Sequence, residues 1–160
     1  SLLQIRDRIT FEAEAAIQLE MIADGIHEKE LQPYPYQLIH GNPVTIDLKP
    51  LIKSIGEDIN KGVEAAIIAA NFHDTLANII VKISHMIKEE CGLRDVVLSG
   101  GVFQNELLLN LAIGYLEKEG FTVWHHKKIP PNDGGISLGQ AVVAWERTKR
   151  KERKDFHKVC

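Results

Sequence analysis

The chain has 160 residues, of which 44% are hydrophobic and 26% charged, which is the size and balance of one globular domain. Nineteen basic against 22 acidic residues give a net charge of −3, too small to favour nucleic acid or a membrane surface as a partner. Polar residues interrupt the apolar stretches, no signal peptide opens the chain, and two cysteines cannot build a disulfide framework. We therefore expect a cytoplasmic protein without a membrane span. Because residue 1 is Ser and a helical pattern follows within ten residues, we also expect a piece of a longer protein.

The first half of the chain predicts three helices. Apolar residues spaced by three and four predict a helix over residues 10–24, with Thr10 as its cap and Gly25 as the left-handed residue that ends it. Four prolines make residues 33–50 a connector, in which residues 44–48 alternate like a short edge strand. Pro50 suits the first turn of a second helix, whose stripe of Leu51, Ile52, Ile55 and Ile59 stops near Gly62. A long third helix covers residues 63–90.

The second half predicts a strand, helix and strand, followed by a final helix. A β-branched run at residues 95–98 ends in a glycine turn, a helix opens near residue 104 and continues to Gly120, and residues 121–124 form a second strand. This order implies a parallel pair with a right-handed crossover. A last helix from Ile136 leads into residues 146–158, which carry a charge of +4 and predict a solvated helix end. We expect mostly helix around an incomplete two-stranded sheet, with an exposed edge or a homodimer contact.

The stretch VVLSGGVFQN, residues 96–105, is the most informative motif. Gly100 and Gly101 directly after a strand let the backbone approach a ligand, and the free N–H groups of the following helix favour an anion. Asn105 on the first turn can bind a ribose or a base through its amide. The pattern suits a nucleotide, although a Ser-Gly-Gly turn can also merely join a strand to a helix. It matches neither GxGxxG nor a phosphate loop.

The stretch IPPNDGGISLGQ, residues 129–140, is the second motif. Asn132 and Asp133 can cap the next helix, while Gly134 and Gly135 remove side chains from its start. A carboxylate on such a cleared loop is a good ligand for a hard metal ion or an anchor for a metal-bound phosphate. A helix cap and a ligand site both remain open from this pattern.

The remaining reactive side chains form no complete site. His125 and His126 are adjacent on a predicted strand, so they point to opposite faces, and His73 and His85 lie about 18 Å apart along one helix. If Asp133 binds a metal, its partner ligands therefore lie outside these residues. Ser99 has no histidine at a recognisable spacing, so a serine hydrolase is not expected.

Cys91, the other nucleophile candidate, is predicted at the C-terminal end of the long helix. The helix dipole there opposes formation of a thiolate. We therefore expect this thiol to be inert.

With these motifs in place, the chain resembles the C-terminal end of the HypF family, the carbamoyltransferases of NiFe-hydrogenase maturation. The matching residues are SGGVFQN (99–105) and PPNDGGISLGQ (130–140), with Phe72-His73 and Phe11-Glu12 as weaker matches. The resemblance implies an α/β fold: a helix-rich C-terminal lobe, with a small parallel sheet, of an actin- and sugar-kinase-like (ASKHA, Kae1-like) domain. On this reading residues 1–160 are one such lobe and residues 146–160 are its basic helical tail.

The same resemblance implies the chemistry and the partners. ATP or a carbamoyl-adenylate made elsewhere in the full protein binds here, and its carbamoyl group passes to the C-terminal cysteine of a HypE-like acceptor. The implied nucleotide-binding residues are Ser99, Gly100, Gly101, Asn105, Gly134 and Glu12. Asp133 is the implied ligand of a divalent metal (iron, zinc or magnesium) whose other ligands, like the N-terminal remainder of the enzyme, lie outside this chain.

Three readings compete with this one. An O-carbamoyltransferase acting on a small natural product shares the domain and the two motifs. A non-catalytic interaction module would use the long helix and the basic tail as a docking surface. A sugar kinase of the actin-like class needs an Asp-Gly-Thr phosphate motif that this sequence lacks.

Overall fold

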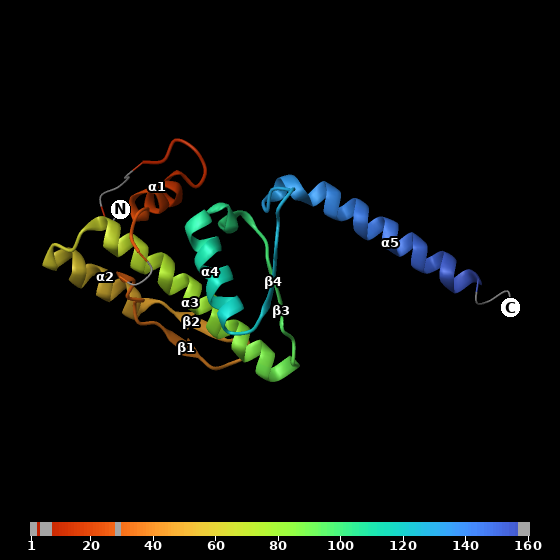
Figure 1. Ribbon diagram of the computed structural model, residues 1–160, viewed down its shortest axis with the longest axis horizontal. Helices are drawn as coiled ribbons and strands as arrows, with labels where there is room; N and C mark the ends of the chain where they lie inside the picture. The colour runs from red at the N-terminus through yellow and green to blue at the C-terminus, as the bar shows by residue number, and fades with distance from the viewer. Residues whose placement is uncertain (1–2, 4–7, 28–29, 157–160) are drawn as a thin grey trace. The chain divides into compact units, whose positions relative to one another are not determined.

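The computed structural model describes residue 3, residues 8–27 and residues 30–156, and of residues 150–156 it describes the backbone alone. Cys160, His157 and the end of the predicted tail lie outside these residues. Figure 1 shows the elements in chain order. They are α1 (Glu14–Ala23), β1 (Gln37–Ile39), β2 (Thr45–Asp47), α2 (Lys49–Lys61), α3 (Ala65–Cys91), β3 (Asp95–Leu98), the 3₁₀ turn η2 (Gly101–Gln104), α4 (Glu106–Lys118), β4 (Thr122–His125), the 3₁₀ turn η3 (Asp133–Gly135) and α5 (Ile136–Phe156).

The chain folds as two compact units. Unit 1 comprises Ser1–Val96 and Asn105–Val123, and unit 2 comprises Val97–Gln104 and Trp124–Cys160. The boundaries fall within β3 and β4, which pair as the small parallel sheet that the strand, helix, strand order predicts. Together with the five α-helices of the described residues, this arrangement confirms the helix-rich α/β class.

Helix α3 is the centre of unit 1, where α1, α2 and α4 pack against it (Figure 1). One apolar cluster joins the α2 residues Leu51 and Ile55 to Ile68 of α3, and a second joins Ala23 of α1 to the start of α3. Leu116 of α4 is completely buried. Leu51 and Ile55 belong to the stripe that the sequence predicts for the second helix, whereas Ile52 of the same stripe lies half exposed.

By length and composition α3 is long and apolar enough to cross a membrane, which corrects the expectation that every apolar stretch is too short. Half of its most apolar window is buried within the chain, and polar side chains such as Asp74 and Thr75 are among its buried residues. Gly92 ends the helix in the left-handed conformation at φ 70°. These properties are those of a central helix that other helices cover.

The connector of residues 30–48 contains a β-hairpin, of which only the second strand is predicted by the sequence. β1 pairs with β2 in antiparallel register, Leu38 opposite Ile46. The segment before β1 is fastened to α3, because the Gln32 and Tyr34 N–H groups donate to Asn71 Oδ1 at 2.9 Å and Thr75 Oγ1 at 2.7 Å. β1 lacks a clear alternating pattern, so its partner strand rather than its own sequence makes it a strand.

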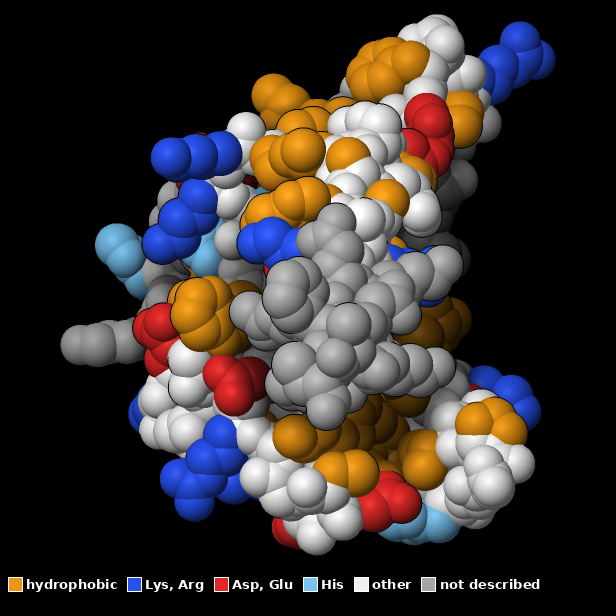
Figure 2. Space-filling view, turned by 90° about the vertical axis from the view of Figure 1, so that its right-hand side faces the viewer, with side chains coloured by type: hydrophobic (Ala, Val, Ile, Leu, Met, Phe, Trp, Pro, Cys, Tyr) orange, Lys and Arg blue, Asp and Glu red, His pale blue; other side chains and the backbone are white. Residues whose placement is uncertain are grey.

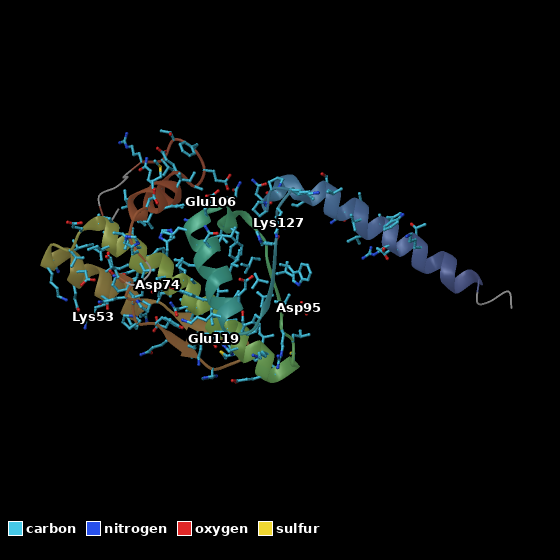
Figure 3. The ribbon with its side chains drawn as sticks, in the orientation of Figure 1. Lys53, Asp74, Asp95, Glu106, Glu119 and Lys127 are labelled. Carbon is cyan, nitrogen blue, oxygen red and sulfur yellow. The ribbon has the colours of Figure 1, made fainter. Side chains whose placement is uncertain are left out.

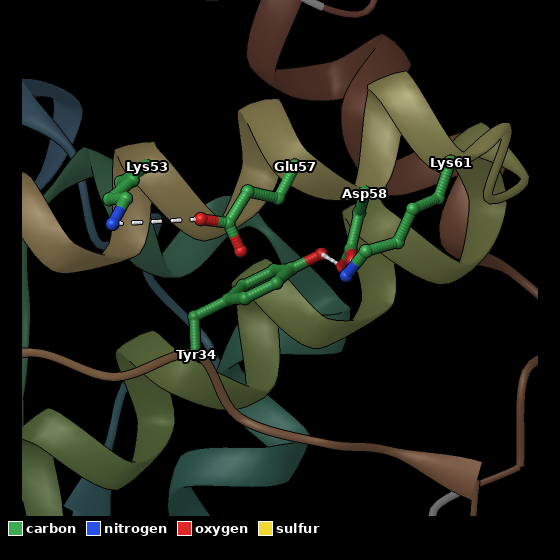
Figure 4. A network of polar contacts seen from close by, with 5 residues as sticks. All are labelled: Tyr34, Lys53, Glu57, Asp58 and Lys61. Atoms are coloured by element: carbon green, nitrogen blue, oxygen red, sulfur yellow. Dashed lines mark hydrogen bonds and ion pairs between the residues drawn. The ribbon is translucent and has the colours of Figure 1, made fainter.

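Tyr34 anchors the same segment against α2. Figure 4 shows its hydroxyl donating to Asp58 Oδ2 at 3.0 Å, beside the exposed ion pairs Lys53–Glu57 and Lys61–Asp58. Burial and the hydrogen bond to Asp58 raise the pKa of the phenol to about 12. Tyr34 therefore stays neutral throughout the physiological pH range.

The start of α1 differs from the prediction. Thr10 does not cap the helix, which begins at Glu14 after Ala13 in a left-handed conformation at φ 63°. Instead, the N–H and hydroxyl of Thr10 both donate to the buried Glu14 Oε2, at 2.6 and 3.0 Å. The burial of Glu14 explains the difference. A buried carboxylate needs hydrogen-bond donors, so Thr10 bonds to Glu14 instead of capping the helix.

Unit 2 has almost no apolar interior. Among its described residues, only Leu98 belongs to the buried hydrophobic residues of the chain. Its exposed large apolar residues are Val97, Val102, Trp124, Ile136, Leu138, Val142, Val143 and Trp145. Figure 2 shows apolar side chains, in orange, open at the surface on the face that it presents. Exposed apolar side chains in such numbers are typical of a protein interaction surface.

Candidate functional site

The two motifs meet within unit 2. Gly100, directly after β3, has φ 109°, a conformation that side chains other than glycine rarely adopt. Its N–H donates to the carbonyl of Pro131 at 2.9 Å, so the first glycine bend is bonded to the Pro-Pro-Asn-Asp loop. A parallel pair of strands joined by a crossover helix places the chain segments after both strands at one edge, which accounts for this convergence. A Cβ added to Gly101 would meet nothing closer than 3.9 Å, so this bend presents open backbone.

The glycines of the second motif serve a different purpose from the predicted one. A Cβ on Gly135 would lie 2.8 Å from the Pro130 carbonyl oxygen, and one on Gly134 would lie 3.1 Å from Asn132 Oδ1. Gly134 and Gly135 therefore let the loop close on itself. Asn132 Oδ1 accepts from the Gly134 N–H at 3.0 Å, so Asn132 caps the 3₁₀ turn η3 that leads into α5 rather than α5 itself.

Asp133 is exposed, and within the described residues its side chain makes no hydrogen bond or ion pair. Its carboxylate is thus available to a ligand or a cation. In the described part of the chain, no group of three or more His, Cys, Asp or Glu side chains could hold a metal ion. Asp133 fits the role of one metal ligand, and these residues do not complete a site.

Sequence reasoning missed one polar pair beside the first bend. Ser99 Oγ and His126 Nε2 lie 2.9 Å apart, and both side chains are exposed. The pair joins the residue after β3 to the residue after β4, so its separation of 27 residues matches no local motif. His125 and His126 are predicted on opposite faces of the strand, which leaves one of the two rings facing outward. That expectation could have identified the Ser99–His126 pair. His125 Nδ1 is buried and has no hydrogen-bond partner among the described residues.

Asn105 belongs to unit 1, where its amide is already engaged. Its Oδ1 accepts from the Leu108 N–H at 2.8 Å as the cap of α4, and its Nδ2 donates to His73 Nε2 at 2.9 Å. His73 is 3% exposed, and its Nδ1 lies 2.7 Å from the Ala69 carbonyl oxygen, which can only accept. His73 is therefore the neutral tautomer with its proton on Nδ1. This confirms its interpretation as a polar member of a helix packing surface.

The predicted free N–H groups at the start of α4 are not free. Glu20 of α1 accepts from the Glu106 N–H at 2.6 Å and from the Leu107 N–H at 3.2 Å, while Asn105 takes the Leu108 N–H. The chain's own carboxylate thus occupies the end of the helix where we expected a ligand anion. The expectation was wrong because Glu20, 86 residues away in sequence, is brought there only by the packing of unit 1.

The residues of the predicted nucleotide set are divided between the two units. Glu12, just before α1, is exposed in unit 1, as is the loop that holds it. Figure 3 labels Asp74, whose side chain is buried, together with Glu106 at the start of α4 and Glu119 directly after its end. Asp74 accepts from the Tyr115 hydroxyl at 2.7 Å, a contact that joins α3 to α4. The structure therefore brings Ser99, Gly100, Gly101, Asp133 and Gly134 into unit 2 and leaves Asn105 and Glu12 in unit 1.

Comparison with known proteins decides the family. The sequence model of the "Carbamoyltransferase, Kae1-like Domain, second subdomain" matches residues 1–140. The chain belongs to the HypF carbamoyltransferase family. It is 38% identical over 146 residues to carbamoyltransferase HypF of Synechocystis, covering 89% of this chain and 18% of that protein. It is 31% identical to HypF2 of Cupriavidus necator, covering 91% of this chain and 21% of that protein.

Solved HypF structures share the fold. A crystal structure of full-length HypF in a phosphate- and nucleotide-bound form superimposes with a TM-score of 0.81 at 41% identity, over 89% of this chain and 18% of that one. The crystal structure of T. kodakarensis HypF gives a TM-score of 0.71 at 27% identity, over 91% of this chain and 18% of that one. The chain thus spans about a fifth of the length of these HypF proteins.

Proposed function

We propose that this chain is the part of a HypF-like carbamoyltransferase that holds a carbamoyl-adenylate against the glycine bend Ser99–Gly101. The adenylate is made from ATP elsewhere in the longer enzyme, which passes the carbamoyl group to the C-terminal cysteine of a HypE-like acceptor. The hydrogen bond from Gly100 N to the Pro131 carbonyl carries the proposal, since it joins the two specific motifs in one unit. That both are held together favours a shared ligand over two independent turns.

The open backbone at the first bend supports a bulky anionic ligand. Gly100 and Gly101 leave room for close approach, and the exposed Ser99 hydroxyl is available as a donor. A related full-length HypF is described as binding phosphate and nucleotide. The α4 N-terminus contributes no free donors, so the backbone and side chains of unit 2 would bear the recognition.

Asp133 is the residue that would hold a divalent metal ion in this proposal. Its exposed carboxylate is a suitable oxygen donor, and the other ligands would come from residues outside this chain. When bound, such an ion would offset the negative charge of the phosphate. In its absence, Asp133 repels an anion, so nucleotide binding by this chain should depend on an added divalent cation.

The apolar surface of unit 2 suits a part that works within a larger enzyme. Both tryptophans of the chain, Trp124 and Trp145, are more than half exposed. We infer that the remainder of a full-length HypF protein covers this surface and completes the nucleotide site. The isolated chain should accordingly show little or no carbamoyl transfer, and sustained transfer to a HypE-like protein by this chain alone would contradict the proposal.

The sharpest test is an NMR titration of the 160-residue chain with ATP and magnesium, because NMR detects binding in the millimolar range. We expect amide shifts at Gly100, Gly101, Asp133 and Gly134, and unchanged amides in the hairpin of β1 and β2 as the internal control. Repeating the titration with Asp133→Asn should abolish the dependence on magnesium. Absence of shifts at the two bends would favour a non-catalytic interaction module.

A further inference from the structure

The pair formed by Ser99 and His126 is not explained by the fold. Both side chains are exposed, so their 2.9 Å contact fills no interior and satisfies no buried group. Such a contact gains little stability in water, because each partner could bond to solvent instead. Its position is informative: Ser99 immediately precedes the open glycine bend of the proposed nucleotide site.

Among the described residues, His126 is the side chain that hydrogen-bonds to the Ser99 hydroxyl. Asn132 uses its Oδ1 on the Gly134 N–H, and His125, on the opposite face of β4, buries its Nδ1. The ionisable neighbours along the chain are Lys127 and Lys128, both exposed, and Asp133 at the end of the same loop. Figure 3 labels Lys127, the residue after His126, where the chain leaves β4.

When an anion is bound, the chemistry of Ser99 and His126 fixes which of the two groups donates the hydrogen bond between them. A hydroxyl has one proton and can also accept, whereas a phosphate oxygen only accepts. Ser99 would therefore donate a hydrogen bond to the phosphate, and its oxygen would accept one from the N–H at His126 Nε2. The hydrogen bonds then run from imidazole to hydroxyl to phosphate, and each polarises the next.

We propose that His126 is a positioning residue of the nucleotide site: its Nε2–H holds the Ser99 hydroxyl so that this donates to a phosphate oxygen of the ligand bound over Gly100–Gly101. This inference rests on the proposed function, and it adds a residue that the two motifs do not contain. Without the ring, the hydroxyl turns among its rotamers and meets the phosphate only part of the time.

The test compares AMP with adenosine, both with magnesium, as ligands of the full 160-residue chain. We expect Ser99→Ala and His126→Ala each to weaken AMP binding about 3–10-fold, the range of one hydrogen bond, and to leave adenosine binding unchanged. The double variant should bind AMP no more weakly than Ser99→Ala. His126→Gln, whose amide can also donate, should recover most of the loss.

His85→Gln is the matched control, because His85 pairs with Glu119 in unit 1, and it should leave AMP binding unchanged. Additive losses in the double variant, or equal losses with adenosine, would overturn the role of His126 while leaving the nucleotide site standing. A wild-type chain that binds neither AMP nor adenosine would overturn the nucleotide site and this role with it.

A second measurement does not depend on a ligand. Ring nitrogen NMR of His126 should change when Ser99 is replaced by Ala, and His85 should serve as the unchanged reference. An identical His126 spectrum in both proteins would show that the pair does not form in solution and would refute the proposal.

Discussion

The two units of this chain contrast in how their apolar side chains are used. Among the described residues, every buried hydrophobic residue except Leu98 belongs to unit 1, whereas unit 2 exposes both tryptophans. A unit without an interior of its own gains little hydrophobic stabilisation. Unit 1 therefore contains the core that stabilises this chain, while unit 2 contains most of the two motifs.

The largest expected effect is a difference in unfolding free energy between a buried side chain of unit 1 and an exposed side chain of unit 2. Leu116→Ala in unit 1 removes a completely buried side chain and should cost about 2–5 kcal/mol of unfolding free energy. Trp145→Ala deletes a larger side chain that is 56% exposed, and should change the free energy by less than about 0.5 kcal/mol. Urea denaturation followed by circular dichroism measures both. Equal losses in the two variants would show that unit 2 has a core after all.

The next effect compares two histidines. His73→Ala should cost about 1–3 kcal/mol, because it leaves the Ala69 carbonyl and Asn105 Nδ2 without their buried partner. His126→Ala removes an exposed ring and should leave the unfolding free energy nearly unchanged. The same denaturation experiment measures both variants. An unchanged unfolding free energy in His73→Ala would mean that water replaces the hydrogen bonds of the ring.

A smaller, local effect distinguishes two adjacent glycines. Gly100→Ala forces a side chain into φ 109° and should destabilise the bend by about 1 kcal/mol or more. Hydrogen exchange of the amide at position 100, which bonds to Pro131, should accelerate about fivefold or more. Gly101→Ala is the control, since its Cβ would meet only ordinary contacts at 3.9 Å. Unchanged exchange in Gly100→Ala would argue against this bend.

The smallest effect at neutral pH concerns Tyr34 in unit 1. Since burial raises its pKa from 10 to about 12, the neutral phenol stabilises the fold below pH 10, and this contribution is lost as pH rises through 12. Tyr34→Phe should cost only about 1 kcal/mol at pH 7 and should remove this part of the alkaline loss. Denaturation at pH 8 and pH 11 compares the two proteins. An equal alkaline loss in both would assign it to other groups.

Local patterns in the sequence predicted much of this structure. The strand β3 has the predicted bounds, Gly62 and Gly92 end their helices in left-handed conformations, and Pro50 lies in the first turn of α2. The meeting of the two motifs also followed, because a parallel pair joined by a crossover helix places the ends of both strands at one edge. Each of these features depends on backbone preferences or on short-range connectivity.

The helix-rich α/β class, the C-terminal ends of α2 and α3 and the two motifs can be read from the amino-acid sequence, because steric preferences and apolar periodicity act over a few residues. Three other features required long-range packing: the pairing of β1, the closure of the start of α4 by Glu20, and the contact of His126 with Ser99. The physical reason is distance along the chain: these partners are brought together by burial and strand pairing elsewhere. A polar side chain can form a long-range hydrogen bond only after the fold has placed a suitable partner beside it.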